Sequence, residues 1–344
     1  METPKPRNAA VILAGAVVKG AFEAGALQVI ADREIPVSRI VAASAGALNG
    51  TAYAAGVRAR REKAAAAEMV AFWCEHGGFF NAFALSLGDL FRGVGASDQR
   101  HLLEHLRGTV QPSSVDNPAP IDLRIVVAAL NGVIGDIGGE PATTYEQILA
   151  FQGEHFDSAA KLEEVFNATV ASAAFPGMFA PVEVPNGVGP CYDGGVVNNA
   201  PIHSALDQGK DTSIDTILVI VPTAAVFPRP AGELTGLSLV SHLAEVLINE
   251  RLYRDLHQAE ATNTSLLKLE ELVRRRGWAP EALPEIKAAM DLGDKRFIKI
   301  VQIRPLVPLP GNGFDGFFDA SMRRNYVEVG IARARAVFDE QGWQ

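Results

Sequence analysis

Short apolar runs alternate with segments of helical periodicity along the first 60 residues. The runs at 9–14 (AAVILA) and 39–44 (RIVAAS) have the length of strands, and the segments that follow them, from Gly20 and from Ala45, have the periodicity of helices. A strand, a helix and a second strand in this order predict a βαβ unit and therefore a parallel sheet. Further strand-like runs, separated by helical patterns, lie at 123–130, 216–222 and 296–303. The whole pattern predicts a layered α/β domain.

Helical periodicity dominates the last third of the chain. One predicted helix face carries Leu239, Leu243, Val246 and Leu247, and another carries Val327, Ile331, Ala334 and Phe338. The Pro-containing stretch 222–236 is the best candidate for a boundary, and we interpret it as a loop between a core and its C-terminal extension. No internal repeat or low-complexity linker divides the chain. We therefore expect residues 206–344 to continue the domain of residues 9–205, as a largely helical part with additional strands.

Composition and charge exclude several classes of protein. Of the 344 residues, 48% are hydrophobic and 21% are charged, which is typical of soluble globular proteins and excludes disordered, collagen-like and coiled-coil chains. The net charge of −9 argues against a nucleic-acid partner, because an acidic chain gains nothing from releasing the counterions of a phosphate backbone. Two cysteines, Cys74 and Cys191, are too few for a disulfide framework or a cysteine-built zinc site.

The N-terminal sequence and the hydropathy indicate where such a protein is found. The first ten residues contain two prolines and lack the apolar core of a Sec signal peptide. The longest nearly uncharged stretches, 9–18 and 79–88, reach about half of the roughly 20 residues that span a bilayer. We therefore expect a cytoplasmic protein without a transmembrane helix, and peripheral contact with a membrane is compatible with that expectation.

Candidate chemistry begins at the end of the second predicted strand, in the sequence VAASAGAL. Ser44 follows the strand and small residues open the next helix, as in a nucleophile elbow, where a strained turn exposes a serine. The positions two residues to either side must be small because strand and helix pass closely. Gly46 meets this requirement, whereas Ala42 adds one methyl group. Alternatively, Ser44 only caps a helix, and this pentapeptide alone leaves both interpretations open.

A glycine-containing loop follows the first predicted strand, in the sequence LAGAVVKGAFEAGAL. It contains Gly15 and the pair Lys19 and Gly20, and its backbone N–H groups could hold an anion. If these groups converge near Ser44, they would form an oxyanion hole, in which each donor typically stabilises the transition state by a few kcal/mol. The loop matches neither G-x-G-x-x-G nor the P-loop pattern, because Lys19 precedes Gly20. A nucleotide site is therefore disfavoured.

A third feature is the sequence CYDGGVVNNAPI. Asp193 stands before Gly194 and Gly195, and paired glycines let the backbone turn and approach other groups closely. By itself, Asp-Gly-Gly is typical of a tight turn. A serine nucleophile needs a base, however, and Asp193 could supply one if the fold brings its carboxylate within hydrogen-bond reach of Ser44.

The order and spacing of these three features resemble the patatin-like phospholipases. The pattern of that family is a G-G-G-x-K/R-G loop, then G-x-S-x-G, then D-G-G or D-G-A. The resemblance covers about residues 9–205 and includes the segments KGAFEAGAL, ASAAFPGMFAPV and NNAPI. It implies a three-layer α/β fold, with a central, mostly parallel sheet between helices and a nucleophile elbow after an early strand.

The same resemblance implies a lipid acyl hydrolase that uses a Ser-Asp dyad, without a catalytic histidine, a metal or a cofactor. Ser44 would be the nucleophile and Asp193 its base. Because aspartate has an ordinary pKa of about 3.9, we expect a partly desolvated pocket around it. The backbone of the loop would hold the oxyanion, and this loop consists of Gly15, Ala16, Val17, Val18, Lys19 and Gly20. The substrate would be a lipid or another acyl ester, and the sequence specifies neither which one nor the oligomeric state.

The loop departs from the family pattern at Ala16, Val17 and Val18, where glycine or alanine is usual. β-Branched residues adopt positive φ poorly, so oxyanion donors that depend on glycine geometry would be displaced. This departure gives an alternative function, a catalytically weak or inactive protein that binds a lipid or a partner. The reacting side chains are intact, which favours catalysis.

Two histidine-based alternatives also arise. Ser44, Asp193 and His203 follow the chain order of an α/β-hydrolase triad, although that fold places several strands before its elbow and only one is predicted here. His101 and His105 are four residues apart on a predicted helix and could bind zinc, but no H-E-x-x-H pattern accompanies them. A packing or solvated role is favoured for these histidines.

Aromatic residues gather in two glycine-interrupted stretches. The first contains Phe79, Phe80, Phe83 and Phe91, and the second contains Phe314, Phe317 and Phe318. Two interpretations are open for each stretch, an acyl pocket or lid beside the active site, and ordinary core packing.

Overall fold

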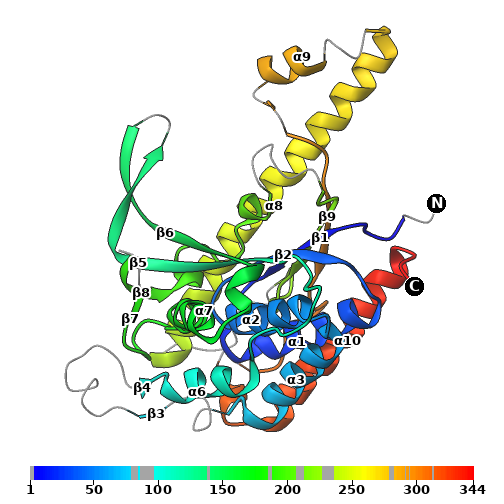
Figure 1. The fold of residues 1–344 in the computed structure, drawn as a ribbon. Helices are drawn as coiled ribbons and strands as arrows, with labels where there is room; N and C mark the ends of the chain where they lie inside the picture. The colour runs from blue at the N-terminus through cyan, green and yellow to red at the C-terminus, as the bar shows by residue number, and fades with distance from the viewer. Residues whose placement is uncertain are drawn as a thin grey trace.

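The computed structural model describes residues 4–78, 84–85, 97–137, 140–184, 188–206, 213–226, 236–278, 283–290, 292–293, 295–311 and 314–344. Within them, the main sheet has the strand order β10-β9-β1-β2-β5-β8-β7, and β6 pairs with β5 (Figure 1). Its strands are β1 (Ala9–Leu13), β2 (Val37–Ala42), β5 (Asp122–Ile137), β6 (Glu140–Gln152), β7 (Val182–Val184), β8 (Gly189–Asp193), β9 (Thr216–Ile220) and β10 (Lys299–Ile303).

The parallel part of the sheet is built from the apolar runs that the sequence analysis identifies. β10, β9, β1, β2 and β5 run parallel to one another, which confirms the prediction of a mostly parallel sheet. β6, β7 and β8 are antiparallel additions that the pattern did not predict. β7 and β8 are short. β6 forms a long hairpin with β5, and the residues of β6 are mostly exposed or half-buried. β7 and β8 lack a continuous apolar run, and β6 has one only near its end, at 148–151.

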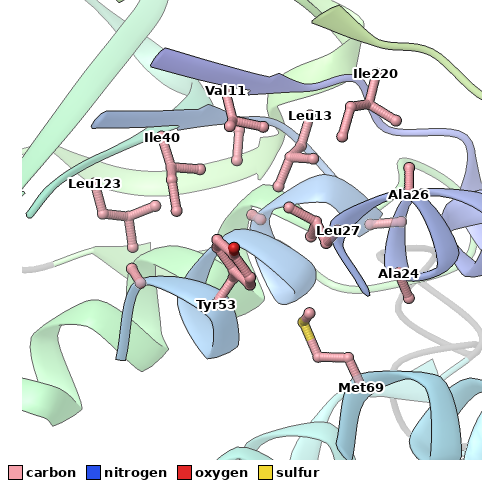
Figure 2. Close-up of a cluster of buried hydrophobic side chains, with 14 of the residues drawn as sticks. Val11, Leu13, Ala24, Ala26, Leu27, Ile40, Tyr53, Met69, Leu123 and Ile220 are labelled. Atoms are coloured by element: carbon pink, nitrogen blue, oxygen red, sulfur yellow. The ribbon is translucent and has the colours of Figure 1, made fainter. Parts of the chain in front are cut away.

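Alternate residues of β1 point to two separate cores. Val11 and Leu13 belong to a core on one face, together with Leu27 of α1 (Gly20–Asp32) and Tyr53 of α2 (Ala45–Arg58) (Figure 2). Ala10 and Ile12 belong to a second core on the other face, with Leu252 and Leu256 of α8 (Gly236–Arg276). Because β1 is central and both of its faces are covered, every one of its residues is buried, and its sequence is uniformly apolar.

Helices cover both faces of the sheet, giving the three-layer α/β architecture that was expected (Figure 1). The face of the first core is covered mainly by α1 (Gly20–Asp32), α2 (Ala45–Arg58), α3 (Glu62–Ala71), α7 (Ala159–Ser172) and α10 (Ala320–Glu340), and α6 (Arg100–Thr109) packs against α7. The other face carries α8 (Gly236–Arg276) and the 3-10 turn η5 (Ile202–Ala205). The distal part of α8 and the short α9 (Leu283–Ala289) extend away from the sheet (Figure 1).

The C-terminal helix packs tightly against the first helix. A Cβ atom at Gly330 of α10 would lie 2.1 Å from the carbonyl oxygen of Phe22, and one at Gly25 of α1 would lie 2.3 Å from that of Val327. Glycine at both positions therefore lets the two helix backbones touch. The predicted apolar face of residues 327–338 is the buried one, since Val327, Ala334 and Phe338 are buried. The proposed boundary loop after residue 226 lies outside the described residues.

Candidate active site

The register of the sheet brings Asp193 to the end of β2. β2 pairs in parallel with β5, where Ala42 is opposite Ile125, and β5 pairs antiparallel with β8, where Val127 is opposite Asp193. Ser44 lies two residues beyond Ala42, and Val127 lies two residues beyond Ile125. The end of β2 and the end of β8 therefore meet at the same level, although 149 residues separate Ser44 from Asp193.

Ser44 lies in a strained turn between β2 and α2. Its φ of 55° and ψ of −129° are rare for a residue other than glycine. A Cβ atom at Gly46 would lie 2.4 Å from the carbonyl oxygen of Leu13, so this position accepts only glycine. The N–H of Ser44 donates to Ser172 Oγ at 2.9 Å, and that hydroxyl donates to the carbonyl oxygen of Val126 at 2.6 Å. The turn is thus held in place from the sheet.

The extra methyl group of Ala42 fits because α2 carries a glycine opposite it. Ala42 is fully buried. A Cβ atom at Gly50 would lie 3.1 Å from Ala42 Cβ, tighter than ordinary van der Waals contact. The absence of a side chain at Gly50 therefore leaves the space that alanine needs in place of the usual glycine.

The Ser44 hydroxyl makes a short hydrogen bond to Asp193. Ser44 Oγ donates to Asp193 Oδ2 at 2.5 Å, both residues are buried, and Ser44 makes no capping hydrogen bond to α2. The other carboxylate oxygen, Oδ1, accepts from the N–H of Gly195 at 2.7 Å. Burial raises the pKa of Asp193 to about 7, although the hydrogen bonds from Ser44 and Gly195 oppose this rise. The carboxylate is therefore basic enough to take a proton near neutral pH.

The loop after β1 lies directly against Ser44. A Cβ atom at Gly15 would lie 2.2 Å from Ser44 Cβ, so the backbone passes the serine at a distance that only glycine permits. The carbonyl oxygen of Gly15 accepts from Asn199 Nδ2 at 2.8 Å. Asn199 follows the Asp193 turn, and this bond therefore ties the loop to the segment that carries the carboxylate.

The rest of this loop forms a 3-10 turn that contains a strained residue. Val17 has a φ of 52°, in the left-handed region where a β-branched residue is an outlier. The N–H of Lys19 donates to the carbonyl oxygen of Ala16 at 3.0 Å, and the N–H of Gly20 donates to those of Val17 and Val18. Two of the loop's N–H groups therefore close the turn itself.

An apolar cavity opens beside the Ser44–Asp193 pair. Its walls include Leu48 of α2, Phe72 and Trp73 of a single π-helical turn (Phe72–His76), Phe175, Phe179 and Phe317. The volume of the cavity is about 40 Å³. Such walls suit the hydrocarbon part of an ester.

The aromatic stretches have different fates. Phe317 lines the cavity, Phe314 packs against Phe175 with ring centroids 5.9 Å apart, and Phe318 is 71% exposed. Residues 79–83 and 86–96, which hold most of the first stretch, lie outside the described residues.

His203 and His105 take no part in the Ser44–Asp193 contact. A hydrogen bond of 2.5 Å leaves no space for an imidazole between the two side chains, and His203 is exposed in η5. His105 stacks on Phe72 at 4.3 Å between ring centroids, and burial lowers its pKa. Among the described residues, no group of three or more His, Cys, Asp or Glu side chains is arranged to hold a metal ion.

Ser172 and Asn199 are the residues of this site that sequence reasoning missed. Both lie in segments that carry the family resemblance, but nothing in their local sequence indicates that Ser172 holds the Ser44 N–H and Asn199 holds the Gly15 carbonyl.

None of the helices in the described part of the chain combines the length and the apolar character that a membrane span requires.

Comparison with known proteins gives one family match and one structural similarity to report. The family model described as patatin-like phospholipase matches residues 11–206, more than half of the chain. The crystal structure of VipD from Legionella pneumophila is similar to this chain with a TM-score of 0.45 and 11% sequence identity, over 99% of this chain and 68% of that one. A search of curated proteins finds no significant match.

Proposed function

Because this chain belongs to the patatin-like phospholipase family, we propose that it hydrolyses carboxylic esters of lipids through a catalytic dyad of Ser44 and Asp193. Membership of this family implies lipid acyl hydrolase activity, and its members are typically serine acyl hydrolases. The observation that carries the assignment of the dyad is the 2.5 Å hydrogen bond from Ser44 Oγ to the buried Asp193 carboxylate. This is the geometry that a nucleophile and its base require.

In the first half of the proposed reaction, Ser44 Oγ attacks the ester carbonyl carbon while its proton moves to Asp193 Oδ2. The carbonyl oxygen becomes an oxyanion in the tetrahedral intermediate. We assign its stabilisation to backbone N–H groups of the loop from Gly15 to Val18, because those of Lys19 and Gly20 close the turn. Collapse of the intermediate breaks the ester C–O bond, and Asp193 returns the proton to the leaving alcohol.

In the second half, water hydrolyses the acyl-enzyme. Asp193 takes a proton from the water, the resulting hydroxide attacks the acyl carbon, and the proton is returned to Ser44 Oγ as the carboxylic acid leaves. A carboxylate with a pKa of about 7 is well matched to both transfers near neutral pH, because a general base works best when its pKa is close to the working pH. Each step uses only side chains and backbone groups of the chain together with water.

The apolar cavity supports an acyl ester as the substrate. Its aromatic and aliphatic walls begin at Ser44 and Asp193, so an acyl chain lying in it would bring its carbonyl carbon to the serine. Burying apolar surface stabilises the bound chain by about 25 cal/mol per Å². Both lipids and simpler acyl esters carry such a chain.

Labelling with a fluorophosphonate probe tests the dyad directly. The wild type should be labelled and should hydrolyse p-nitrophenyl esters, while Ser44→Ala and Asp193→Asn should lose both properties. Ser204→Ala is the matched control, since Ser204 is also buried but lies in η5, on the other face of the sheet. Labelling that survives in Ser44→Ala would refute the nucleophile.

A folded wild type that neither labels nor hydrolyses esters would support the second candidate, a catalytically inactive lipid- or partner-binding protein. The left-handed conformation of Val17 favours that candidate, because it alters the loop that would hold the oxyanion. In that case Ser44→Ala should leave lipid binding unchanged.

A further inference from the structure

A buried polar cluster of Glu23, Asn49 and Trp73 adjoins the cavity, because Trp73 is one of its walls. Asn49 of α2 donates from Nδ2 to the carbonyl oxygen of Gly20 at 2.9 Å and to Glu23 Oε2 at 2.9 Å. Its Oδ1 accepts from Trp73 Nε1 at 2.8 Å. Glu23, Asn49 and Trp73 are all at most 4% exposed. Such a cluster is costly to bury unless its polar groups are paired.

These contacts fix the orientation of the Asn49 amide. The side-chain nitrogen faces two acceptors and the side-chain oxygen faces the indole donor, so rotating the amide by 180° would leave all three contacts mismatched. Burial raises the pKa of Glu23 well above its ordinary value, although the hydrogen bond from Asn49 opposes this rise. Glu23 Oε2 is the acceptor that holds one side of the amide.

Each contact of Asn49 reaches a part of the proposed active site. Asn49 lies five residues after Ser44 on the helix that the serine begins. Gly20 is the residue where the loop after β1 ends and α1 begins. Trp73 forms a wall of the cavity, and its Cζ2 would lie 3.0 Å from a Cβ atom at Gly20, so the indole ring rests against the end of the loop.

The backbone of Trp73 is held separately from its ring. Arg323 of α10 is buried and donates from Nε to the carbonyl oxygen of Trp73 at 2.8 Å, and from a guanidinium nitrogen to that of Gly316 at 2.6 Å. Gly316 precedes Phe317, another wall of the cavity. Arg323 therefore fixes where the Trp73 backbone lies, whereas Asn49 fixes which way the indole ring faces.

We propose that Asn49 is a positioning residue for acyl transfer. Its hydrogen bonds hold the end of the loop after β1, at Gly20, and the indole ring of Trp73 in fixed positions relative to α2, the helix that Ser44 begins. This inference rests on the function proposed above. Asn49 does not touch the substrate in this proposal. It acts through the Gly20 carbonyl and the indole N–H, and Glu23 acts through Asn49.

A residue of this kind must be distinguished from one that only stabilises the core, and the chain offers a matched control. Thr51 lies on the same helix two residues later, is fully buried, and its hydroxyl hydrogen-bonds to Thr169 Oγ1 at 2.7 Å, away from the cavity lining. Asn49→Leu and Thr51→Val each replace a buried, hydrogen-bonded side chain by an apolar one of similar size. Both should lower the melting temperature.

The first readout is kinetic and is measured at a temperature where every variant is folded. We expect Asn49→Leu to slow fluorophosphonate labelling of Ser44 and to lower kcat for p-nitrophenyl butyrate by at least tenfold, with little change for Thr51→Val. Trp73→Phe keeps an aromatic wall but removes the indole donor and makes the ring smaller, and it should slow both rates by a smaller factor. The double variant of Asn49→Leu and Trp73→Phe should then be no slower than Asn49→Leu alone, because the two changes break the same contact.

The second readout does not depend on catalysis. Hydrogen exchange of the Trp73 indole N–H, assigned in the NMR spectrum by its loss in Trp73→Phe, should accelerate at least tenfold in Asn49→Leu and stay unchanged in Thr51→Val. Glu23→Gln keeps an acceptor oxygen for the Asn49 amide and should preserve both exchange and activity, whereas Glu23→Ala should impair both. If Asn49→Leu fails to fold, Trp73→Phe and the two Glu23 variants still decide the kinetic part.

The outcomes separate this inference from the proposed function. Equal kinetic losses in Asn49→Leu and Thr51→Val, or unchanged indole exchange in Asn49→Leu, would overturn the positioning role while leaving the dyad intact. A wild type that never labels would refute the proposed function and, with it, any role of Asn49 in acyl transfer, even if the exchange result links Asn49 to Trp73.

Discussion

Replacing Asp193 with asparagine should stabilise the protein at neutral and alkaline pH. The carboxyl is 3% exposed and burial raises its pKa from 3.8 to about 7. The folded protein therefore holds a proton on Asp193 between these two pH values, whereas the unfolded chain has released it. Stability falls with rising pH wherever the folded state binds more protons, so ionisation of Asp193 destabilises the wild type increasingly up to about pH 7.

The size of this effect follows from the shift. A tenfold change in proton affinity corresponds to about 1.4 kcal/mol, so raising the pKa of Asp193 from 3.8 to about 7 costs about 4 kcal/mol of stability above pH 7. With an unfolding entropy of about 2 cal/mol/K per residue, a chain of this length converts that free energy into about 5 °C of melting temperature. Asparagine has nearly the shape of the protonated carboxyl and still offers an oxygen to the N–H of Gly195, so Asp193→Asn avoids this cost.

The assay is thermal unfolding of the wild type and Asp193→Asn from pH 4 to pH 9, followed by circular dichroism. The difference in melting temperature should be close to zero at pH 4, grow through pH 5 to 7 and level off at about 5 °C. Other buried acids, such as Glu23, occur in both proteins, and their titration cancels in the difference. A difference that does not depend on pH, or one that shrinks as pH rises, would refute the claim that burial holds the Asp193 pKa high.

Three further predictions concern the same region and the helix packing beneath it. The value of kcat/KM for p-nitrophenyl butyrate should rise about tenfold between pH 6 and pH 8, because Asp193 loses its proton in this range and becomes a competent base. A flat pH profile would exclude Asp193 as the base. Val17→Gly should change the free energy of unfolding by less than about 1 kcal/mol in urea titrations, because relief of a left-handed β-branched residue offsets the added chain entropy and the lost packing of a partly buried side chain. A loss of more than about 2 kcal/mol would mean that Val17 is not strained. Gly330→Ala should lower the free energy of unfolding by about 3 kcal/mol, because the new methyl group would meet the Phe22 carbonyl. Gly108→Ala is the control and should not destabilise the protein, because no atom lies within 4 Å of its Cβ position. Equal effects at the two glycines would contradict the close packing of α1 and α10.

Local sequence determined most of the parallel sheet and the shape of the serine turn. Buried parallel strands are rich in apolar residues, so β1, most of β9 and the second half of β2 stand out as short apolar runs. The small residues around Ser44 are demanded by contacts between segments close in the chain, such as Gly46 against Leu13. The sequence also anticipated the difficulty at Val17, because positive φ is a property of a single residue and its side chain.

Only the tertiary structure decided how distant segments meet. The short antiparallel strand β8 lacks a continuous apolar run, yet its register against β5 brings Asp193 to Ser44. The pKa of that carboxylate depends on burial, which is created by all the surrounding elements together. Ser172 and Asn49 are ordinary polar residues of helices until packing gives each a partner from another element. A hydrogen bond or a desolvated charge depends on the distance between groups that the chain order leaves free, and only the packed fold sets that distance.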